Sequence, residues 1–401
     1  MTLTLLFDLD DTLLSNSIDT FLNAYLRALG KHLIAHVAPD LMVKNLLAAT
    51  DVMVANNQAG LSLERAFDQV FYPAIGKTKG ELRETLGYFY DHIFPSLKGL
   101  TNQRPEAIVV VERAQAQGHT LVVATNPLFP QKAMEHRLRW AGLAPEKTPF
   151  ALISSYEGFH FSKPNPAYIA EILAQLGWPE QPAVMIGNSI EDDLLPAARL
   201  GLPGYLVTDQ PVVLPTSLHP LSAQGPLSAV SAWIDQVEAA QPQLEFNTPA
   251  CLLAVLKSTP AAMETISRAL NPQLWRTRPA PDQWSLTEIF CHLRDVDQEV
   301  NLPRVEKIMA EKNPFVQGIN SDTWADERSY NREDGLTGLH EFIHARTRLI
   351  ERLANLPDEA WRLSARHAIF GPTQLIELVS FIATHDQSHD RQVMGVVNTL
   401  N

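Results

Sequence analysis

Residues 7–13 read Phe-Asp-Leu-Asp-Asp-Thr-Leu and directly follow an apolar run, Leu3–Phe7. In an open parallel sheet, ligands bind at the carboxyl ends of the strands. We therefore expect Asp8 and Asp10 to project from the end of a first strand into a binding crevice. Two carboxylates this close repel each other unless a cation neutralises them, and a hard divalent ion such as Mg²⁺ prefers oxygen ligands of this kind. An acidic turn that caps a helix is the alternative explanation for this pattern taken alone.

Three further segments carry polar side chains after apolar runs or before helical patterns. They are Ala124-Thr125-Asn126-Pro127, Ser162-Lys163-Pro164-Asn165-Pro166 and Ile186-Gly187-Asn188-Ser189-Ile190-Glu191-Asp192-Asp193. Thr125 and the adjacent backbone N–H group could hold phosphate oxygens, and Lys163 could balance the charge of a phosphoryl group. Asp192 and Asp193 add acids for a metal ion. Together these groups predict a phosphate site far more specifically than any one of them alone.

The first 210 residues alternate between apolar runs and helical patterns, which is typical of parallel strands joined by helices. The expected strands are Leu3–Phe7, Leu121–Ala124, Ala151–Ile153, Ala183–Ile186 and Tyr205–Val207. Residues 15–100 contain only helix-like segments, so we expect a helical insertion there. The sequence thus predicts a Rossmann-like parallel sheet formed by residues 1–14 and 101–210, with a helical cap formed by residues 15–100.

The rest of the chain has a different pattern. Residues 211–245 are rich in proline, and we interpret them as a linker with a short helix around Ala229–Ala239. Residues 246–401 then contain helical patterns alone, and four amphipathic segments predict a four-helix bundle. These segments are Pro249–Leu270, Ser285–Lys312, Leu336–Leu356 and Thr373–Leu400. The expected fold class is a multidomain protein that joins an α/β part to an all-α part.

Composition excludes several classes of protein. The chain has 401 residues, of which 45% are hydrophobic and 19% charged, as is ordinary for globular proteins. Because the net charge is −13, we expect neither nucleic acid nor an anionic membrane as a partner. The N-terminal segment lacks a leading cationic region, so we expect no export signal. Cys251 and Cys291 cannot form a disulfide framework, which fits a reducing cytoplasm.

The helical part contains a second candidate site. His385 and His389 lie one turn apart on one helix face, and His292 lies in an apolar stretch of another helix, where an unpaired imidazole would be costly to bury. A bundle can bring these three together around Zn²⁺ or Ni²⁺ with one coordination position open. His340 and His344 have the same spacing, and a surface or capping role is the alternative for either pair.

The four segments at the strand ends resemble the signature of the haloacid dehalogenase-like (HAD) hydrolase superfamily, over about residues 1–210. This resemblance implies that Asp8 is the nucleophile and Asp10 the general acid/base. It also implies that Thr125 binds the phosphoryl group and that Lys163 steadies both nucleophile and phosphate. The dehalogenases of this superfamily lack the second aspartate, so Asp10 favours phosphoester chemistry.

The same resemblance assigns a Mg²⁺ ion to Asp8 and Asp10 together with Asp192 or Asp193. Counting back from the expected helix at Ala197–Gly201 makes Asp193 the better match, with Asp192 second. The helical insertion matches the position of the cap domain of this superfamily, which selects the substrate and excludes water.

Two asparagines complete the comparison with this signature. Asn126, next to Thr125, is expected to help bind the substrate. Asn188 departs from the signature, which commonly has Gly-Asp at this point. Its amide oxygen can ligate a metal or orient water but supplies no charge, so Asp192 and Asp193 must supply the anion.

The C-terminal helices resemble the DinB-like (YfiT-like) metal-binding four-helix family over about residues 246–401. The matching elements are Trp284 with His292, the His367-x-x-x-Gly371 segment and His385-Asp386-x-x-His389-x-x-Gln392. The resemblance implies that His292, His385 and His389 bind a divalent metal and that some relatives transfer low-molecular-weight thiols. Asp386 and Asp390 could orient an imidazole.

These observations predict a cytoplasmic Mg²⁺-dependent phosphatase that hydrolyses a small phosphorylated metabolite through an aspartyl-phosphate. They also predict that this hydrolase is fused to a metal-binding bundle through which the chain forms a homodimer. In one alternative, the bundle is a metal-dependent thiol transferase and the phosphatase-like part is accessory. In the other, the bundle is a non-enzymatic, metal-dependent dimerisation module.

Overall fold

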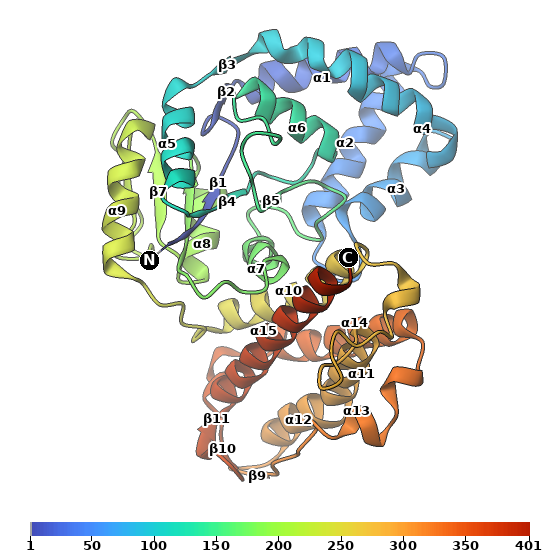
Figure 1. Ribbon diagram of the computed structural model, residues 1–401, viewed down its shortest axis with the longest axis vertical. Coiled ribbons are helices and arrows are strands. Elements are labelled where there is room, and N and C mark those ends of the chain that lie inside the picture. Colours follow the sequence, from blue (N-terminus) through green and yellow to red (C-terminus); the bar gives the residue numbers. More distant parts are fainter. Residues whose placement is uncertain (1) are drawn as a thin grey trace. The chain divides into compact units, whose positions relative to one another are not determined.

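The computed structural model describes residues 2–401, and its contacts divide the chain into two compact units. The first unit comprises Met1–Asn57, Leu61–Ile169 and Glu180–Leu244, and the second comprises Gln58–Gly60, Ala170–Pro179 and Glu245–Asn401. Figure 1 shows their helices and strands in colours that follow the sequence. The domain boundaries expected from the sequence remain predictions.

A parallel sheet forms the centre of the first unit, and in the described part of the chain it has six strands in the order β5-β4-β1-β6-β7-β8. They are β1 (Thr4–Phe7), β4 (Thr120–Val123), β5 (Leu152–Ile153), β6 (Ala183–Gly187), β7 (Gly204–Val207) and β8 (Ala223–Gly225). The central strand β1 is buried along its whole length, as expected of a parallel strand covered on both faces.

The strand register determines which residues share the ligand-binding edge. Phe7, the last residue of β1, pairs with Val123 of β4 and with Ile186 of β6. The three strands therefore end at the same level. The residues that follow them, among them Asp8 and Thr125, lie along one edge of the sheet.

Helices surround the sheet and form the insertion that follows β1. They are α1 (Ile18–His32), α2 (Pro39–Ala55), α3 (Leu63–Ala74), α4 (Lys79–Tyr88), α5 (Pro105–Ala116), α6 (Gln131–Trp140), α8 (Leu195–Arg199) and α9 (Val230–Ala240). Helix α7 (Pro166–Gln175) begins in the first unit, and its residues from Ala170 onward belong to the second. The short strands β2 (Leu14–Asn16) and β3 (Thr101–Gln103) pair antiparallel and close the base of this insertion. Aromatic contacts of Phe21 with Phe94, Phe129 and Trp140 pack α1 against α6 and the loop after β4.

The segment interpreted as a linker, residues 211–245, contributes to the core of the first unit, so that interpretation needs correction. Strand β8 extends the sheet by pairing with β7, and Trp233, Ile234 and Val237 of α9 are buried in the main hydrophobic core. The indole N–H of Trp233 donates to the carbonyl of Leu221 at 2.8 Å. The proline-rich composition concealed a strand of only three residues, too short to show a period.

Three π-helical turns occur in the described residues, and each ends two residues before a proline. They are η1 (Phe89–Ile93) before Pro95, η3 (Ile190–Leu194) before Pro196 and η6 (Asp297–Asn301) before Pro303. Proline lacks an N–H group, and its ring collides with the carbonyl four residues earlier in a regular helix. A widened turn relieves this collision, and such turns are frequent at functional sites.

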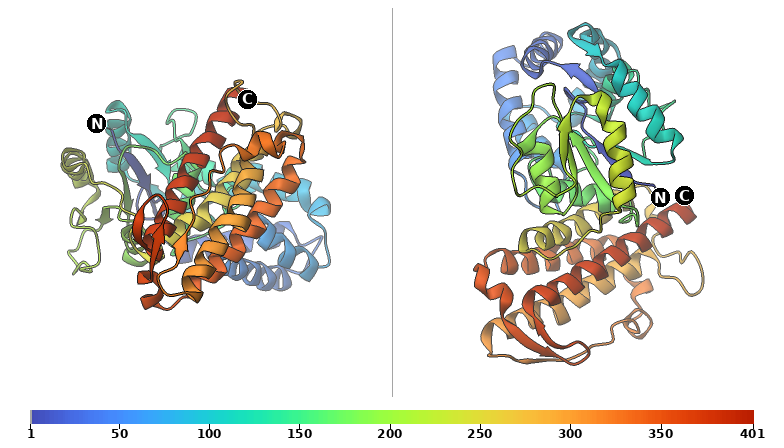
Figure 2. Two further views of the ribbon diagram at one scale, coloured as in Figure 1. Left: turned by 90° about the horizontal axis from the view of Figure 1, so that it is seen from below. Right: turned by 90° about the vertical axis from the view of Figure 1, so that its left-hand side faces the viewer.

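Long helices make up most of the second unit. They are α10 (Pro249–Ser267), α11 (Leu286–Val296), which continues through η6 into α12 (Leu302–Ala310), α14 (Gly335–Ala354) and α15 (Leu375–Leu400). Helix α10 packs against α14 and α15, and α11 packs against α14, as the views in Figure 2 show. The α/β part and the helical bundle confirm the expected fold class. No helix within residues 2–401 is both long and apolar enough to span a membrane.

The connections within the bundle contain structure that the sequence did not predict. A small sheet with the order β11-β10-β9 joins β9 (Phe315–Val316), β10 (Ser364–His367) and β11 (Gly371–Gln374). The connection before α14 contains α13 (Trp324–Glu327), and its Ala325 and Tyr330 pack against Cys291. It therefore covers part of α11. The remaining short helical turns are η2 (Phe94–Leu100), η4 (Leu227–Ala229), η5 (Pro272–Leu274), η7 (Tyr330–Arg332) and η8 (Asp358–Arg362).

We predict that Trp233→Ala destabilises the first unit by about 3–5 kcal/mol, the cost of emptying a buried aromatic site. Val213→Ala is the matched control, because Val213 lies in the same segment but is 95% exposed. Calorimetry of the two variants should show a lowered transition for Trp233→Ala alone. Equal behaviour of the variants would restore the linker interpretation.

Candidate active site and metal centre

Asp8, Lys163 and Asp193 meet at the edge where β1 and β6 end. Asp8 directly follows β1, Lys163 precedes α7, and Asp193 lies in the π-helical turn η3 after β6. The Nζ atom of Lys163 donates to Asp8 Oδ1 at 2.8 Å and to Asp193 Oδ1 at 2.5 Å. All three side chains are buried. One ammonium group therefore bridges two carboxylates from segments far apart in the sequence.

The second oxygen of each carboxylate also has a donor. Thr12 Oγ1 donates to Asp8 Oδ2 at 3.1 Å, and the backbone N–H of Ser189 donates to Asp193 Oδ2 at 3.0 Å. Burial lowers the pKa of Lys163, but the charges of Asp193 and Asp8 outweigh it and leave that pKa above its ordinary value. Burial also raises the pKa of Asp193, with the charge of Lys163 opposing the shift. The ammonium group therefore stays protonated between the two acids.

Asp10 has a cationic partner that the sequence interpretation missed. Its Oδ1 atom accepts from the guanidinium of Arg137, on α6, and from Asn16 Nδ2 at 2.8 Å. Arg137 is almost completely buried, beside the rings of Phe21 and Phe129. Burial lowers the pKa of Arg137 to about 10, and the charge of Asp8 opposes that shift, so the guanidinium is charged at neutral pH. The only sequence signal was an arginine on an otherwise apolar helix face.

Lys163 and Arg137 already offset part of the repulsion between Asp8 and Asp10, and the Mg²⁺ ion expected from the sequence stays a prediction. The site still fits a hard cation. Asp8 and Asp193 share the Lys163 ammonium, whereas Asp10 pairs with Arg137. Each carboxylate oxygen can accept more than one bond, and oxygen donors are those that Mg²⁺ prefers.

The sequence left open whether Asp192 or Asp193 belongs to the candidate site, and the two side chains lie differently in the structure. Asp193 points to Lys163, whereas Asp192 is exposed and its Oδ2 lies 3.4 Å from Ser189 Oγ. Asn188 is also exposed. Gly187 explains how Asp193 reaches the site, because a Cβ atom at Gly187 would overlap the Asp193 carboxylate.

Thr125 and Asn126 lie at the same edge, beyond the end of β4. Thr125 is buried, and its carbonyl accepts from the hydroxyl of Tyr168 at 2.7 Å. This bond fixes the backbone on which the Thr125 side chain is carried. The Oδ1 atom of Asn126 is buried without a hydrogen-bond partner among the described residues, so it can accept a bond from a bound molecule.

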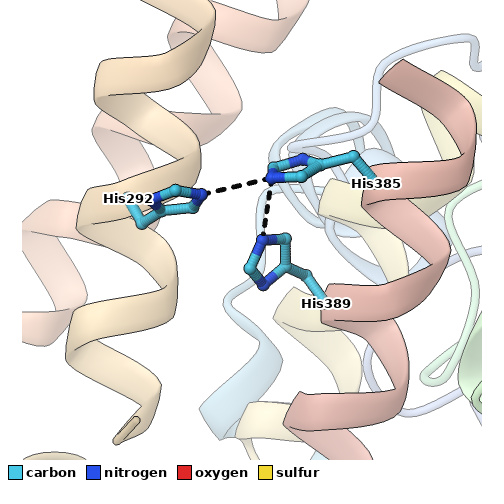
Figure 3. Close-up of side chains that lie close together, drawn as sticks. All are labelled: His292, His385 and His389. Carbon is cyan, nitrogen blue, oxygen red and sulfur yellow. Dashed lines mark hydrogen bonds between the residues drawn. The ribbon is translucent and has the colours of Figure 1, made fainter. Parts of the chain in front are cut away.

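The three candidate histidines of the bundle also come together. Figure 3 shows His292 on α11 facing His385 and His389 on α15. His385 Nε2 lies 3.2 Å from His292 Nε2 and 3.1 Å from His389 Nε2. Within residues 2–401, no other group of three or more His, Cys, Asp or Glu side chains has potential ligand atoms that all lie within 4.8 Å of one another.

The chemistry of this triad fits a transition metal. Burial lowers the pKa of His292 to about 3 and that of His385 to about 4, and it lowers the pKa of His389 well below its ordinary value. All three rings are therefore neutral at pH 7, as metal ligation requires. Nitrogen ligands about 2.0–2.1 Å from a tetrahedral zinc ion lie about 3.3 Å apart, close to the spacing seen here.

Gln392 is placed to orient the imidazole of His389. Asp386 and Asp390, which the sequence suggested for this role, pair with other groups. His389 Nδ1 lies 2.8 Å from Gln392 Oε1. An N–H donated to this oxygen leaves Nε2 with its lone pair free for a metal. Asp386 instead pairs with Arg346, and Asp390 accepts a bond from Thr259 at 3.1 Å.

Arg346 forms a buried ion-pair network beside the triad. Its Nε donates to Asp297 Oδ2 at 2.6 Å, and one terminal nitrogen donates to Asp386 Oδ1 at 2.9 Å. All three side chains are almost completely inaccessible to solvent. The network connects α14, η6 and α15, and so fixes the helix that carries His385 and His389.

The remaining histidine pair and the cysteines lie outside the triad. His340 and His344 are exposed on α14, which is compatible with the surface role considered for this pair. Cys251 and Cys291 are both free and buried, and burial raises the pKa of each thiol to about 12. Both thiols are therefore protonated at neutral pH and unsuited to act as nucleophiles.

Comparisons with known proteins divide the chain in the same way. Residues 2–201 match the sequence profile of the haloacid dehalogenase-like hydrolases, and residues 256–393 match that of the DinB superfamily. A phosphoglycolate phosphatase from Mesorhizobium japonicum is 27% identical over 118 residues, which cover 29% of this chain and 49% of that protein. The chain thus spans about half the length of this curated relative.

Solved structures with low sequence identity cover each part. A HAD phosphatase from Thermococcus onnurineus is 16% identical with a TM-score of 0.37, over 61% of this chain and 100% of that one. YfiT from Bacillus subtilis, described as a probable metal-dependent hydrolase with an unusual four-helix bundle topology, is 15% identical with a TM-score of 0.35. That match covers 39% of this chain and 89% of YfiT.

We predict that His389→Ala abolishes stoichiometric binding of Zn²⁺ or Ni²⁺. Loss of a group that only orients a metal ligand costs about 10–100-fold in affinity, and loss of the ligand itself should cost at least as much. Elemental analysis after loading and desalting measures the effect. His344→Ala, which removes an exposed histidine, should leave the metal content unchanged, and equal metal loss in both variants would contradict the site.

Proposed function

Because residues 2–201 match the profile of the haloacid dehalogenase-like hydrolases and residues 256–393 that of the DinB superfamily, we propose that the protein is a Mg²⁺-dependent phosphomonoester hydrolase. The observation that carries this proposal is the buried Lys163 ammonium between Asp8 and Asp193. It fixes the Asp8 carboxylate at the ligand-binding edge of the sheet, and a nucleophile must be held in place in this way.

In the first half of the proposed reaction, an Asp8 oxygen attacks phosphorus and the bond to the leaving oxygen breaks. Asp10 gives a proton to that oxygen, and Asp8 becomes an aspartyl-phosphate. In the second half, Asp10 takes a proton from water, which attacks phosphorus and releases phosphate. Covalent capture thus divides one difficult displacement into two easier ones.

The surrounding residues hold charge and position in this scheme. Lys163 offsets the negative charge that would otherwise repel a phosphate from Asp8. Mg²⁺, for which Asp8 and Asp193 are the proposed ligands, would supply further positive charge to the phosphoryl oxygens when bound. Thr125 and Asn126 would bind the same oxygens.

In the proposed reaction Asp10 must both give and accept a proton while its carboxylate is paired with Arg137. Arg137 donates to Asp10 Oδ1. The carboxylate form of Asp10 accepts a proton from water in the second half of the reaction. Donation to the leaving group requires the protonated form. A phosphate ester entering the site would compete for the Arg137 guanidinium and so release Asp10 to bind a proton.

The substrate is proposed to be a small phosphorylated metabolite. The Mesorhizobium relative is a phosphoglycolate phosphatase by its name, so phosphoglycolate is one compound to test. A cytoplasmic location also remains part of this proposal.

For the bundle we propose binding of one transition-metal ion by His292, His385 and His389. Three neutral imidazoles leave a coordination position open, which suits a thiolate as well as water. Metal-dependent thiol transfer is therefore a second candidate activity, with an external thiol, because Cys251 and Cys291 are buried and protonated. A metal-dependent homodimer is the non-enzymatic alternative.

We predict that Asp8→Asn lowers Mg²⁺-dependent hydrolysis of p-nitrophenyl phosphate on the order of 10³-fold or more, as loss of a covalent nucleophile does. His389→Ala is the control and should keep the wild-type rate within about twofold. Chelation by EDTA should abolish the wild-type activity and added Mg²⁺ should restore it. Activity that survives in Asp8→Asn, or chloride release from 2-chloropropionate without phosphatase activity, would refute the assignment.

We also predict that Gly187→Ala lowers the phosphatase kcat by about 10²-fold, the scale of a displacement of about 1 Å at a catalytic group. The new methyl group must push the Asp193 carboxylate away from Lys163. Gly99→Ala is the matched control, because a Cβ atom there meets nothing within 4 Å. An unchanged kcat in Gly187→Ala would show that the position of Asp193 does not limit the reaction.

A further inference from the structure

A deep groove in the second unit runs beside the histidine triad. Its volume is about 800 Å³, and it is lined by α12, α15, the residues around Gly318–Asp322 and the turn between β10 and β11. His385 is part of this lining. We call this cavity the triad groove. The proposed phosphatase reaction does not use this cavity.

His367 presents an unused hydrogen-bond donor in the triad groove. Its Nδ1 atom accepts the backbone N–H groups of Ile369 at 3.2 Å and Phe370 at 3.4 Å. In the neutral ring the proton must therefore be on Nε2. Burial and the charge of Arg304 lower the pKa of His367, so the ring stays neutral.

That Nε2–H group is buried without a partner among residues 2–401, in a side chain only 4% exposed. A buried donor without an acceptor is costly. Because His367 lines the groove, an acceptor on a bound molecule can satisfy it.

Arg304 places a positive charge in the same groove. One of its terminal nitrogens donates to the carbonyl of Gln317 at 2.7 Å. Burial lowers its pKa, and in the described part of the chain no carboxylate lies within ion-pair distance of it. Asp322 also lines the groove but is exposed. A half-buried guanidinium without an acidic partner, close to an unused N–H donor, favours an anion.

Aromatic and aliphatic side chains form the remaining wall. The rings of Phe370 and Phe381 stack with their centroids 3.9 Å apart, although each side chain is more than 40% exposed. Ile369 is 73% exposed beside them, and Leu378 and Ile382 also line the groove. Exposed apolar side chains grouped around a cavity are typical of a binding surface.

We propose that the triad groove binds a small apolar molecule that ends in a carboxylate. The carboxylate accepts bonds from the Arg304 guanidinium and from His367 Nε2–H, and the apolar part covers Phe370 and Phe381. One guanidinium charge matches a single carboxylate, whereas a phosphate dianion would remain under-neutralised. A ligand bound in this way lies next to His385, so the groove is the substrate-binding site of the metal centre.

The probe for this proposal is octanoate, with octylammonium and 1-octanol as partners of matched chain length. Isothermal titration of the full chain is done with Zn²⁺ loaded and again after treatment with EDTA. Octanoate should bind at least about tenfold more tightly than octylammonium in both states, because only the carboxylate can accept both donors. Equal affinity for the two probes would overturn the proposal, and so would octanoate binding that requires zinc, since the carboxylate would then be a simple metal ligand.

Two variants test the donors. Arg304→Gln and His367→Asn should each weaken octanoate binding about tenfold and change 1-octanol binding less than twofold. Asparagine at 367 keeps an acceptor for the turn N–H groups but loses the Nε2–H donor. Arg348→Gln and His344→Asn, at exposed positions of α14, are the matched controls and should bind octanoate normally. Unchanged octanoate affinity in both groove variants would overturn the proposal, while retained 1-octanol binding shows that the groove is intact.

Discussion

The ion pair of Lys163 with Asp8 and Asp193 is the constraint on which the catalytic edge of the first unit depends. It joins the end of β1, the loop before α7 and the turn after β6. Two buried carboxylates without this ammonium would repel each other, and breaking a buried pair by removing one partner is strongly destabilising. Strands β1 and β6 end at the same level, and Gly187 has no side chain that would displace Asp193. Both features bring these three groups into contact.

The second unit uses the same arrangement for a different purpose. Arg346 lies between Asp297 and Asp386, as Lys163 lies between Asp8 and Asp193. In the first unit the bridged acid is itself the proposed nucleophile. In the bundle the bridged acids accept hydrogen bonds from Arg346, and the network fixes the helix that carries the histidines. A buried ion pair by itself is weak evidence for net stability. Here each network joins the elements that carry one candidate site.

The sequence predicted those site residues whose placement follows from regular structure. Asp8 follows a strand, and the one-turn spacing of His385 and His389 puts them on one helix face, so strand order and helical period were enough. Arg137 could not be assigned, because its partnership with Asp10 depends on how α6 packs. Strand β8 was missed because three residues in a proline-rich segment show no periodicity. The role of Gln392 required the ring orientation of His389, which no pattern records.

The π-helical turn η3 also bears on how this chain can be compared with others. Leu195 donates its N–H to Ile190, five residues back instead of four, so the turn holds one residue more than a regular α-helical turn. A relative whose sequence forms an ordinary turn there would present its acid one position away in any alignment. A sequence alignment between a chain with this π-helical turn and one with a regular turn is therefore offset by one residue. Equivalent acids are then identified by their three-dimensional positions.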